Sequence, residues 1–113
     1  MSTPTLQDTE YHAAADRLLA AIERQADDWL QQGVIDIDTN RSGGLLELAF
    51  PNGSKVVLNT QPPLHELWLA AGAGGFHFRT VGERWIDREG RELFEVLSEC
   101  ASAQAGRPLR FAP

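Results

Sequence analysis

The chain has 113 residues, 42% of them hydrophobic, and its 16 acidic residues outnumber its 10 lysines and arginines, giving a formal net charge of −6. This length fits one compact domain with its own hydrophobic core, spanning residues 1–113, and leaves no room for a second. No segment approaches the roughly 18 to 20 consecutive apolar residues that a membrane span requires, so we expect no membrane partner.

The N-terminus and the cysteine content indicate a cytoplasmic protein. The opening MSTPTLQDTEYH has the pattern of neither a signal peptide nor an arginine-rich transit peptide. The single cysteine, Cys100, excludes an internal disulfide and a cysteine-cluster metal site, and it suits a reducing compartment. Cys100 belongs to an apolar stripe and is expected to be a small buried hydrophobe.

The excess negative charge lies in the first third of the chain. Residues 1–38 hold eight acids against two arginines, a net charge of −6, whereas residues 39–113 hold eight acids and eight bases. This asymmetry argues against nucleic-acid binding, which needs a basic face. It favours cations or a basic protein surface as partners.

The first predicted element is an amphipathic helix of about six turns that ends near Gly33. Its apolar residues recur at intervals of three and four: Tyr11, Ala15, Leu18, Ile22, Ala26 and Trp29. Beside this apolar face, one stripe carries His12, Asp16, Glu23 and Asp27, while Arg17, Arg24 and Asp28 lie on the other side. The two arginines therefore do not neutralise the stripe. The like charges of Glu23 and Asp27 cost about 0.2 to 0.5 kcal/mol.

The segment VIDIDT, residues 34–39, alternates with a period of two and is predicted to be a strand. Ile35 and Ile37 would then face the core, and Asp36 and Asp38 would face water. If this strand lies beside the first helix, the helix stripe and the two aspartates form one acidic ridge.

Five more strands and a second helix follow. The strands are LLELAF and KVVLN around the Asn52-Gly53 hairpin turn, and then LHELWLAA, GFHFRT and RWID. Helical spacing returns in residues 88–106, with Gly106 as the predicted stop. The fold class is therefore α+β: a two-layer sandwich in which two helices pack on one face of a mostly antiparallel sheet of about six strands.

No catalytic constellation is apparent, so we do not expect an enzyme. No serine or cysteine nucleophile has a base and an orienting group at recognisable spacing, and carboxylates on an open ridge lack the burial that raises a pKa. His65 and His77 are interpreted as packing or turn residues. The alternation of residues 64–69 favours exposure of Trp68, opposite Leu67 and Leu69, as in an interface anchor.

One set of residues has an order and spacing that are specific in combination. It comprises Asn59, Gln61, Pro63, Leu64, His65, Trp68, Leu69, Ala70, Gly74, Gly75, Phe76, His77, Phe78, Trp85, Asp87 and Gly90. With the opening helix and the PNGSK hairpin, this pattern resembles the bacterial branch of the frataxin family over about residues 9–111.

The resemblance implies a frataxin-like sandwich, weak iron binding along an acidic ridge, and a role in iron–sulfur cluster assembly through contact with the cysteine desulfurase. By position, the acidic ridge corresponds to His12, Asp16, Glu23, Asp27, Asp28, Asp36 and Asp38. The exposed sheet patch of the family corresponds to Asn59, Gln61 and Trp68. Two positions depart from the bacterial pattern: Arg24 stands where relatives often carry an acid, and Thr60 where they often carry a base.

We therefore expect a non-enzymatic, iron-binding modulator of iron–sulfur cluster assembly. Carboxylates are hard ligands that suit Fe²⁺ and Fe³⁺, and on an open face they bind weakly and exchangeably. The expected partners are the cysteine desulfurase and the iron–sulfur scaffold machinery, with the protein a monomer and iron-dependent association left open. Two alternatives remain: a ferroxidase that oxidises Fe(II), and an acidic decoy that binds a basic partner without iron.

Overall fold

The computed structural model describes residues 6–113, apart from the side chain of Leu6, as two helices and a six-stranded sheet. The elements in chain order are α1 (Leu6–Gln31), β1 (Asp38–Ser42), β2 (Leu45–Ala49), β3 (Lys55–Gln61), the short 3-10 helix η1 (Pro62–Leu64), β4 (Glu66–Ala71), β5 (Gly74–Val81), β6 (Arg84–Ile86) and α2 (Leu93–Ala105). None of the helices in this part of the chain has the length and apolar content needed to cross a membrane.

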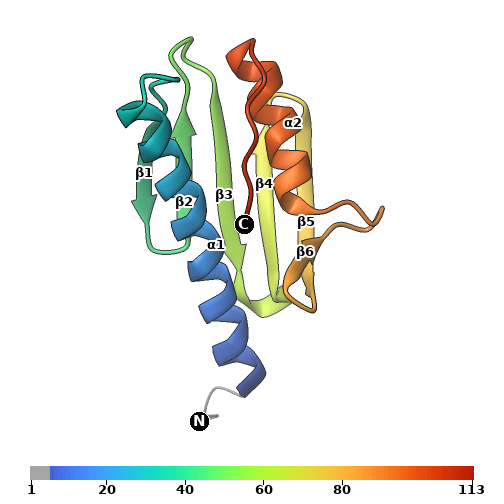
Figure 1. Ribbon diagram of the computed structural model, residues 1–113. Coiled ribbons are helices and arrows are strands. Elements are labelled where there is room, and N and C mark those ends of the chain that lie inside the picture. Colours follow the sequence, from blue (N-terminus) through green and yellow to red (C-terminus); the bar gives the residue numbers. More distant parts are fainter. Residues whose placement is uncertain (1–5) are drawn as a thin grey trace.

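The sheet is an antiparallel meander in which each strand pairs with the next along the chain, in the order β1 to β6. Both helices lie on the same side of it, as Figure 1 shows, with α1 over the β1 end and α2 over the β4–β5 end. The predicted α+β sandwich is confirmed. The opposite side of the sheet is left without a helix and is here called the open face.

Alternation along the strands separates the two sides of the sheet. Leu46, Leu48, Leu58, Leu67 and Phe78 are fully buried towards the helices. The apolar stripe predicted for α1 is buried as well, with Trp29 partly so. Because alternate residues point to opposite sides, the neighbours of these buried residues form the open face.

The C-terminal segment, residues 107–113, lies between the two helices (Figure 1) and was not anticipated from the sequence. Leu109 and Phe111 are buried in the core, and Phe111 packs edge-on against Trp29 with 4.7 Å between ring centroids. The Ser102 hydroxyl donates to the Leu109 carbonyl and accepts from its amide, both at 2.9 Å. These bonds satisfy the backbone of a segment that has no strand partner of its own.

Two predicted boundaries are wrong. The first strand begins at Asp38 rather than Val34, because Val34 caps α1: its amide bonds to Trp29 O at 2.8 Å while Gly33 takes a left-handed φ of 72°. The second helix starts at Leu93, because the Glu92 carboxylate caps it by accepting from the amides of the next turn. Before it, residues 88–90 form a turn, and Glu92 makes an isolated β-bridge with Ile86.

Candidate metal-binding and docking surface

Two carboxylates of the acidic ridge are paired with an arginine of the neighbouring strand. Arg41 Nη2 lies 2.9 Å from Asp16 Oδ1, and Arg41 Nη1 lies 3.3 Å from Glu23 Oε1. Arg41 is on β1, so these contacts confirm that the first strand lies beside α1. They also neutralise part of the stripe that the arginines of α1 itself leave unpaired.

The remaining carboxylates of the ridge are exposed and unpaired. Asp27 and Asp28 lie near the end of α1, Asp36 lies in the connection after it, and Asp38 begins β1. Across residues 6–113, no basic side chain is within ion-pair distance of these four. The end of the ridge near the α1–β1 connection therefore holds the concentrated negative charge.

Asp38 does not continue the stripe of α1 on the same side of the sheet. It pairs with Ala49, the neighbour of buried Leu48, and so faces the open side. Arg41, three residues later, faces the helices. The ridge thus wraps around the edge strand instead of forming one flat surface.

His12 is exposed on the first half of α1, one turn before Asp16. Its ring meets the Tyr11 ring edge-on, with 5.2 Å between centroids. Among the described residues, no group of three or more histidine, cysteine, aspartate or glutamate side chains converges as a metal site. The ridge therefore offers separate carboxylates, not a closed cage.

The sheet patch lies on the open face, where its side chains are half-buried. Asn59, Trp68 and His77 form one row across β3, β4 and β5, because each pairs directly with the next. The indole of Trp68 stacks on the His77 imidazole, with 4.2 Å between centroids and 7° between planes. Trp68 thus faces the predicted side of the sheet and is partly covered by His77.

The Glu66 carboxylate fixes the Trp68 indole through its Nε1 atom. Trp68 Nε1 donates to Glu66 Oε1 at 2.9 Å, and Arg79 Nε pairs with Glu66 Oε2 at the same distance. The hydrogen bond from Trp68 is the largest cause that lowers the pKa of Glu66. Burial opposes this shift, and the contact with Arg79 lowers the pKa further. Trp68 is therefore held in one orientation by a hydrogen bond and by ring stacking.

Thr60 lies between two patch residues but faces the helices. It pairs with buried Leu67, and its amide bonds to Gly44 O at 2.9 Å. A Cβ at position 44 would lie 2.0 Å from Thr60 Oγ1, so any side chain there would displace Thr60. Thr60 therefore packs closely against Gly44 on the helix side of the sheet.

The turn before Trp68 is tied to α1 through Tyr11. The Tyr11 hydroxyl donates to Glu66 O at 2.6 Å and accepts from the Gln61 amide at 3.1 Å. Its ring stacks on His65, which has a left-handed φ of 51° and contacts Asp8 through Nε2. Burial is the main cause that raises the pKa of the Tyr11 hydroxyl.

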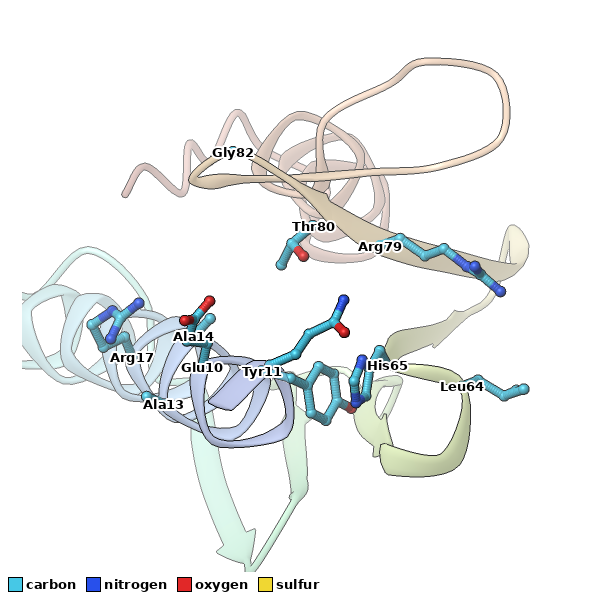
Figure 2. A pocket seen from close by; sticks show the side chains of 11 residues that line it. Glu10, Tyr11, Ala13, Ala14, Arg17, Leu64, His65, Arg79, Thr80 and Gly82 are labelled. Atoms are coloured by element: carbon cyan, nitrogen blue, oxygen red, sulfur yellow. The ribbon is translucent and has the colours of Figure 1, made fainter. Parts of the chain in front are cut away.

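A polar groove of about 550 Å³ lies beside this contact, between the first turns of α1 and the β5–β6 end. In Figure 2 the parallel rings of Tyr11 and His65 lie on one wall, with Thr80 and Arg79 opposite them.

Cys100 is buried in α2, as predicted, and burial raises the pKa of its thiol. The residues that sequence reasoning missed are Arg41, Glu66 and Arg79. Arg41 pairs with buried Leu46 across the β1–β2 turn, which places it on the helix side. The sequence could have indicated this only if the first strand had been predicted to extend to Ser42. Glu66 and Arg79 could be related only through the β4–β5 register.

Comparison with known proteins agrees with this geometry. The family model for the frataxin-like domain matches residues 4–107. The chain is 48% identical over 109 residues to the "Iron-sulfur cluster assembly protein CyaY" of Paraburkholderia phymatum, covering 96% of this chain and 100% of the relative. It is 46% identical to the protein of the same name from Verminephrobacter eiseniae, covering 95% of this chain and 99% of the relative.

Solved structures show the same fold. Frataxin from Psychromonas ingrahamii superposes with a TM-score of 0.80 at 34% identity, over 94% of this chain and 98% of that one. A trimeric frataxin from Saccharomyces cerevisiae, complexed with ferrous iron, superposes with a TM-score of 0.64 at 23% identity, over 95% and 92% of the two chains, a likeness of fold alone. The chain belongs to the frataxin family.

Proposed function

We propose that this protein is a non-enzymatic modulator of iron–sulfur cluster assembly in the cytoplasm, which binds iron weakly and contacts the cysteine desulfurase. The single observation that carries the proposal is the set of exposed, unpaired carboxylates, Asp27, Asp28, Asp36 and Asp38, on a frataxin-family fold. The relatives named as iron–sulfur cluster assembly proteins support a role in this process.

Iron enters this proposal as cargo. The exposed carboxylates supply hard oxygen ligands, and water completes the coordination of a cation held by one or two of them. Such binding is weak and rapidly reversible, which suits transfer or sensing better than storage. The iron-bound yeast frataxin supports iron as the metal, while its similarity to this chain rests on the fold.

Docking on the cysteine desulfurase uses two surfaces in the proposal. The acidic ridge attracts a basic patch of the partner over a distance of about a Debye length, roughly 8 to 10 Å at physiological salt. Asn59, Gln61 and Trp68 then make short-range contacts, with Trp68 as the anchor because aromatic side chains dominate interface energies. The fixed orientation of Trp68 supports this role, since little conformational freedom remains to be lost on binding.

The test of iron binding is an anaerobic titration of isotopically labelled protein with Fe(II), followed by NMR at each backbone amide. We expect broadening centred on Asp27, Asp28 and Asp36, with none on the open face around Asn59. The double variant Asp27→Asn/Asp36→Asn should lose most of it, and Glu95→Gln/Glu99→Gln, which neutralises two exposed acids of α2, should not. Uniform or absent changes at millimolar iron would refute the iron-binding part.

A parallel measurement separates this function from a ferroxidase. Oxygen uptake is recorded after Fe(II) is added to the protein in air, against buffer and the same double variant. The proposal expects no uptake above the buffer rate. Protein-dependent uptake that disappears with the ridge acids would instead assign an enzymatic role.

A further inference from the structure

Arg41 has a position that distinguishes it from the exposed arginines of the chain. It pairs with Leu46 of β2, which is fully buried beneath the helices, so its side chain projects from the sheet towards α1. Only 25% of the side chain remains exposed, against 66% for Arg79. Arg41, although it is on an edge strand, therefore lies beside the acidic stripe of α1.

All three guanidinium nitrogens of Arg41 are engaged. Nε donates to Gly43 O at 3.2 Å, Nη1 contacts Glu23 and Nη2 contacts Asp16. The bond to Gly43, in the β1–β2 turn, fixes the plane of the guanidinium, so that its two outer nitrogens point at carboxylates seven residues apart on α1. A cation held from three directions is more persistent than an isolated surface ion pair.

We propose that Arg41 is a built-in counter-ion of the acidic ridge: it occupies Asp16 and Glu23, and a divalent metal ion binds these carboxylates only by displacing it. This inference rests on the proposed iron binding and names its regulation. The guanidinium holds one oxygen of each carboxylate, Asp16 Oδ1 and Glu23 Oε1, so neither carboxylate can chelate a metal through both oxygens, and its positive charge opposes a second cation at the same place.

The consequence is a ridge divided into two parts of different accessibility. Iron first occupies the unpaired group formed by Asp27, Asp28, Asp36 and Asp38. Asp16 and Glu23 fill only at higher metal concentration. Their occupation also releases the Arg41 contact that ties α1 to β1, so a loaded ridge differs from an empty one in how its helix is tethered.

The experiment compares Arg41→Gln with the wild-type chain in the anaerobic Fe(II) titration, reading amide broadening separately at Asp16 and Glu23 and at Asp27 and Asp36. Breaking one arginine–carboxylate pair, two unit charges at about 4 Å, corresponds to roughly a fivefold change in affinity even in water. We therefore expect half-maximal broadening at Asp16 and Glu23 at about fivefold lower Fe(II), with little change at Asp27 and Asp36.

Two further variants make the comparison specific. Arg84→Gln removes an equal charge from an exposed residue of β6, at the opposite edge of the sheet, and should leave both titrations unchanged. Arg41→Lys keeps the charge but loses the planar fork, and should fall between wild type and Arg41→Gln. Thermal unfolding of all three checks that they fold.

The outcomes separate this inference from the proposed function. Identical broadening at Asp16 in wild type and Arg41→Gln, with binding intact at Asp27, would overturn the role of Arg41 alone. An equal gain in Arg84→Gln would overturn it too, because net charge would then suffice. Absence of binding in every variant would overturn both the inference and the iron-binding function.

Discussion

The acidic ridge and the sheet patch are built in opposite ways. At the ridge, Asp27 and Asp36 are exposed and have no basic partner within residues 6–113. At the patch, Trp68 stacks on His77 and donates a hydrogen bond to Glu66, and Glu66 is paired with Arg79. One surface concentrates charge on exposed side chains, and the other holds an aromatic side chain in a fixed place.

The difference assigns a separate task to each surface. Exposed charges act over distance and raise the rate of encounter, but they discriminate poorly between partners. A preorganised aromatic contributes only on direct contact, and it lengthens the lifetime of the complex. In this account the ridge attracts iron and the basic partner, and the patch recognises the partner.

Replacement of the patch anchor should have the largest effect. Trp68→Ala is expected to weaken binding to the cysteine desulfurase by about 30-fold or more, equivalent to about 2 kcal/mol, mainly through faster dissociation. Surface plasmon resonance measures both rates. Val81→Ala, which truncates an apolar residue that is 63% exposed at the end of β5, serves as the control. An unchanged dissociation rate for Trp68→Ala would remove the patch from the interface.

The tie between α1 and the patch is tested by Tyr11→Phe. The variant removes one hydroxyl that serves both Glu66 O and the Gln61 amide, so it should cost about 1 to 3 kcal/mol in unfolding free energy. Chemical denaturation measures this, with Ser42→Ala as an exposed hydroxyl control. Should the two variants prove equally stable, the Tyr11 contact would not support the turn before Trp68.

The Glu66 carboxylate, which accepts a hydrogen bond from Trp68, predicts that the stability of the fold depends on pH. Because folding lowers the pKa of Glu66 below its ordinary value of 4.5, the ionised carboxylate stabilises the native state above that pH. This stabilisation is lost as the pH falls through the folded pKa. Glu66→Gln should therefore be less stable than wild type near pH 7 and show a smaller loss of stability below pH 4.5.

Urea unfolding at a series of pH values measures this difference for Glu66→Gln. Asp87 follows the same sign: its pKa is lowered because hydrogen bonds from the Arg91 and Glu89 amides outweigh the opposing effect of burial. It is unchanged in the variant, so its contribution cancels from the comparison. Parallel curves for wild type and Glu66→Gln would show that the patch does not depend on the ionised carboxylate.

Cations should stabilise the fold by a smaller amount. Since repulsion among the ridge carboxylates opposes folding, Mg²⁺ at about ten times a weak dissociation constant adds about 1.4 kcal/mol and raises the melting temperature by a few degrees. Asp27→Asn/Asp36→Asn should show less of this rise, with NaCl of equal ionic strength as the reference. An equal rise in both proteins would place the effect outside the ridge.

Much of this structure could be predicted from local patterns. The buried stripe of α1 follows from helical spacing, and the β2–β3 hairpin follows from Asn52-Gly53, where Gly53 has a φ of 88°. The start of β1 could not be predicted the same way. Val34 to Ile37 alternate like a strand, but the capping bond from Val34 to Trp29 takes them out of the sheet.

The candidate site was predictable in composition and less so in arrangement. The sequence shows how many acids lie near α1, and it assigns Trp68 to the side opposite Leu67. It does not show that Arg41, 25 residues after Asp16, neutralises the first part of the stripe. That contact depends on strand register and on the tight β1–β2 turn, which only the assembled sheet defines.

The most direct test of the account is the salt dependence of desulfurase association, measured by stopped flow for wild type, Trp68→Ala and the charge reversal Asp27→Lys/Asp36→Lys. We predict that the charge reversal slows association by about tenfold at low salt and flattens its salt dependence, while Trp68→Ala keeps the wild-type slope. Glu83→Lys/Glu99→Lys, an equal reversal off the ridge, should have little effect. Association that is as fast and as salt-sensitive after reversal at Asp27 and Asp36 as before would contradict the division between an attracting ridge and a recognising patch.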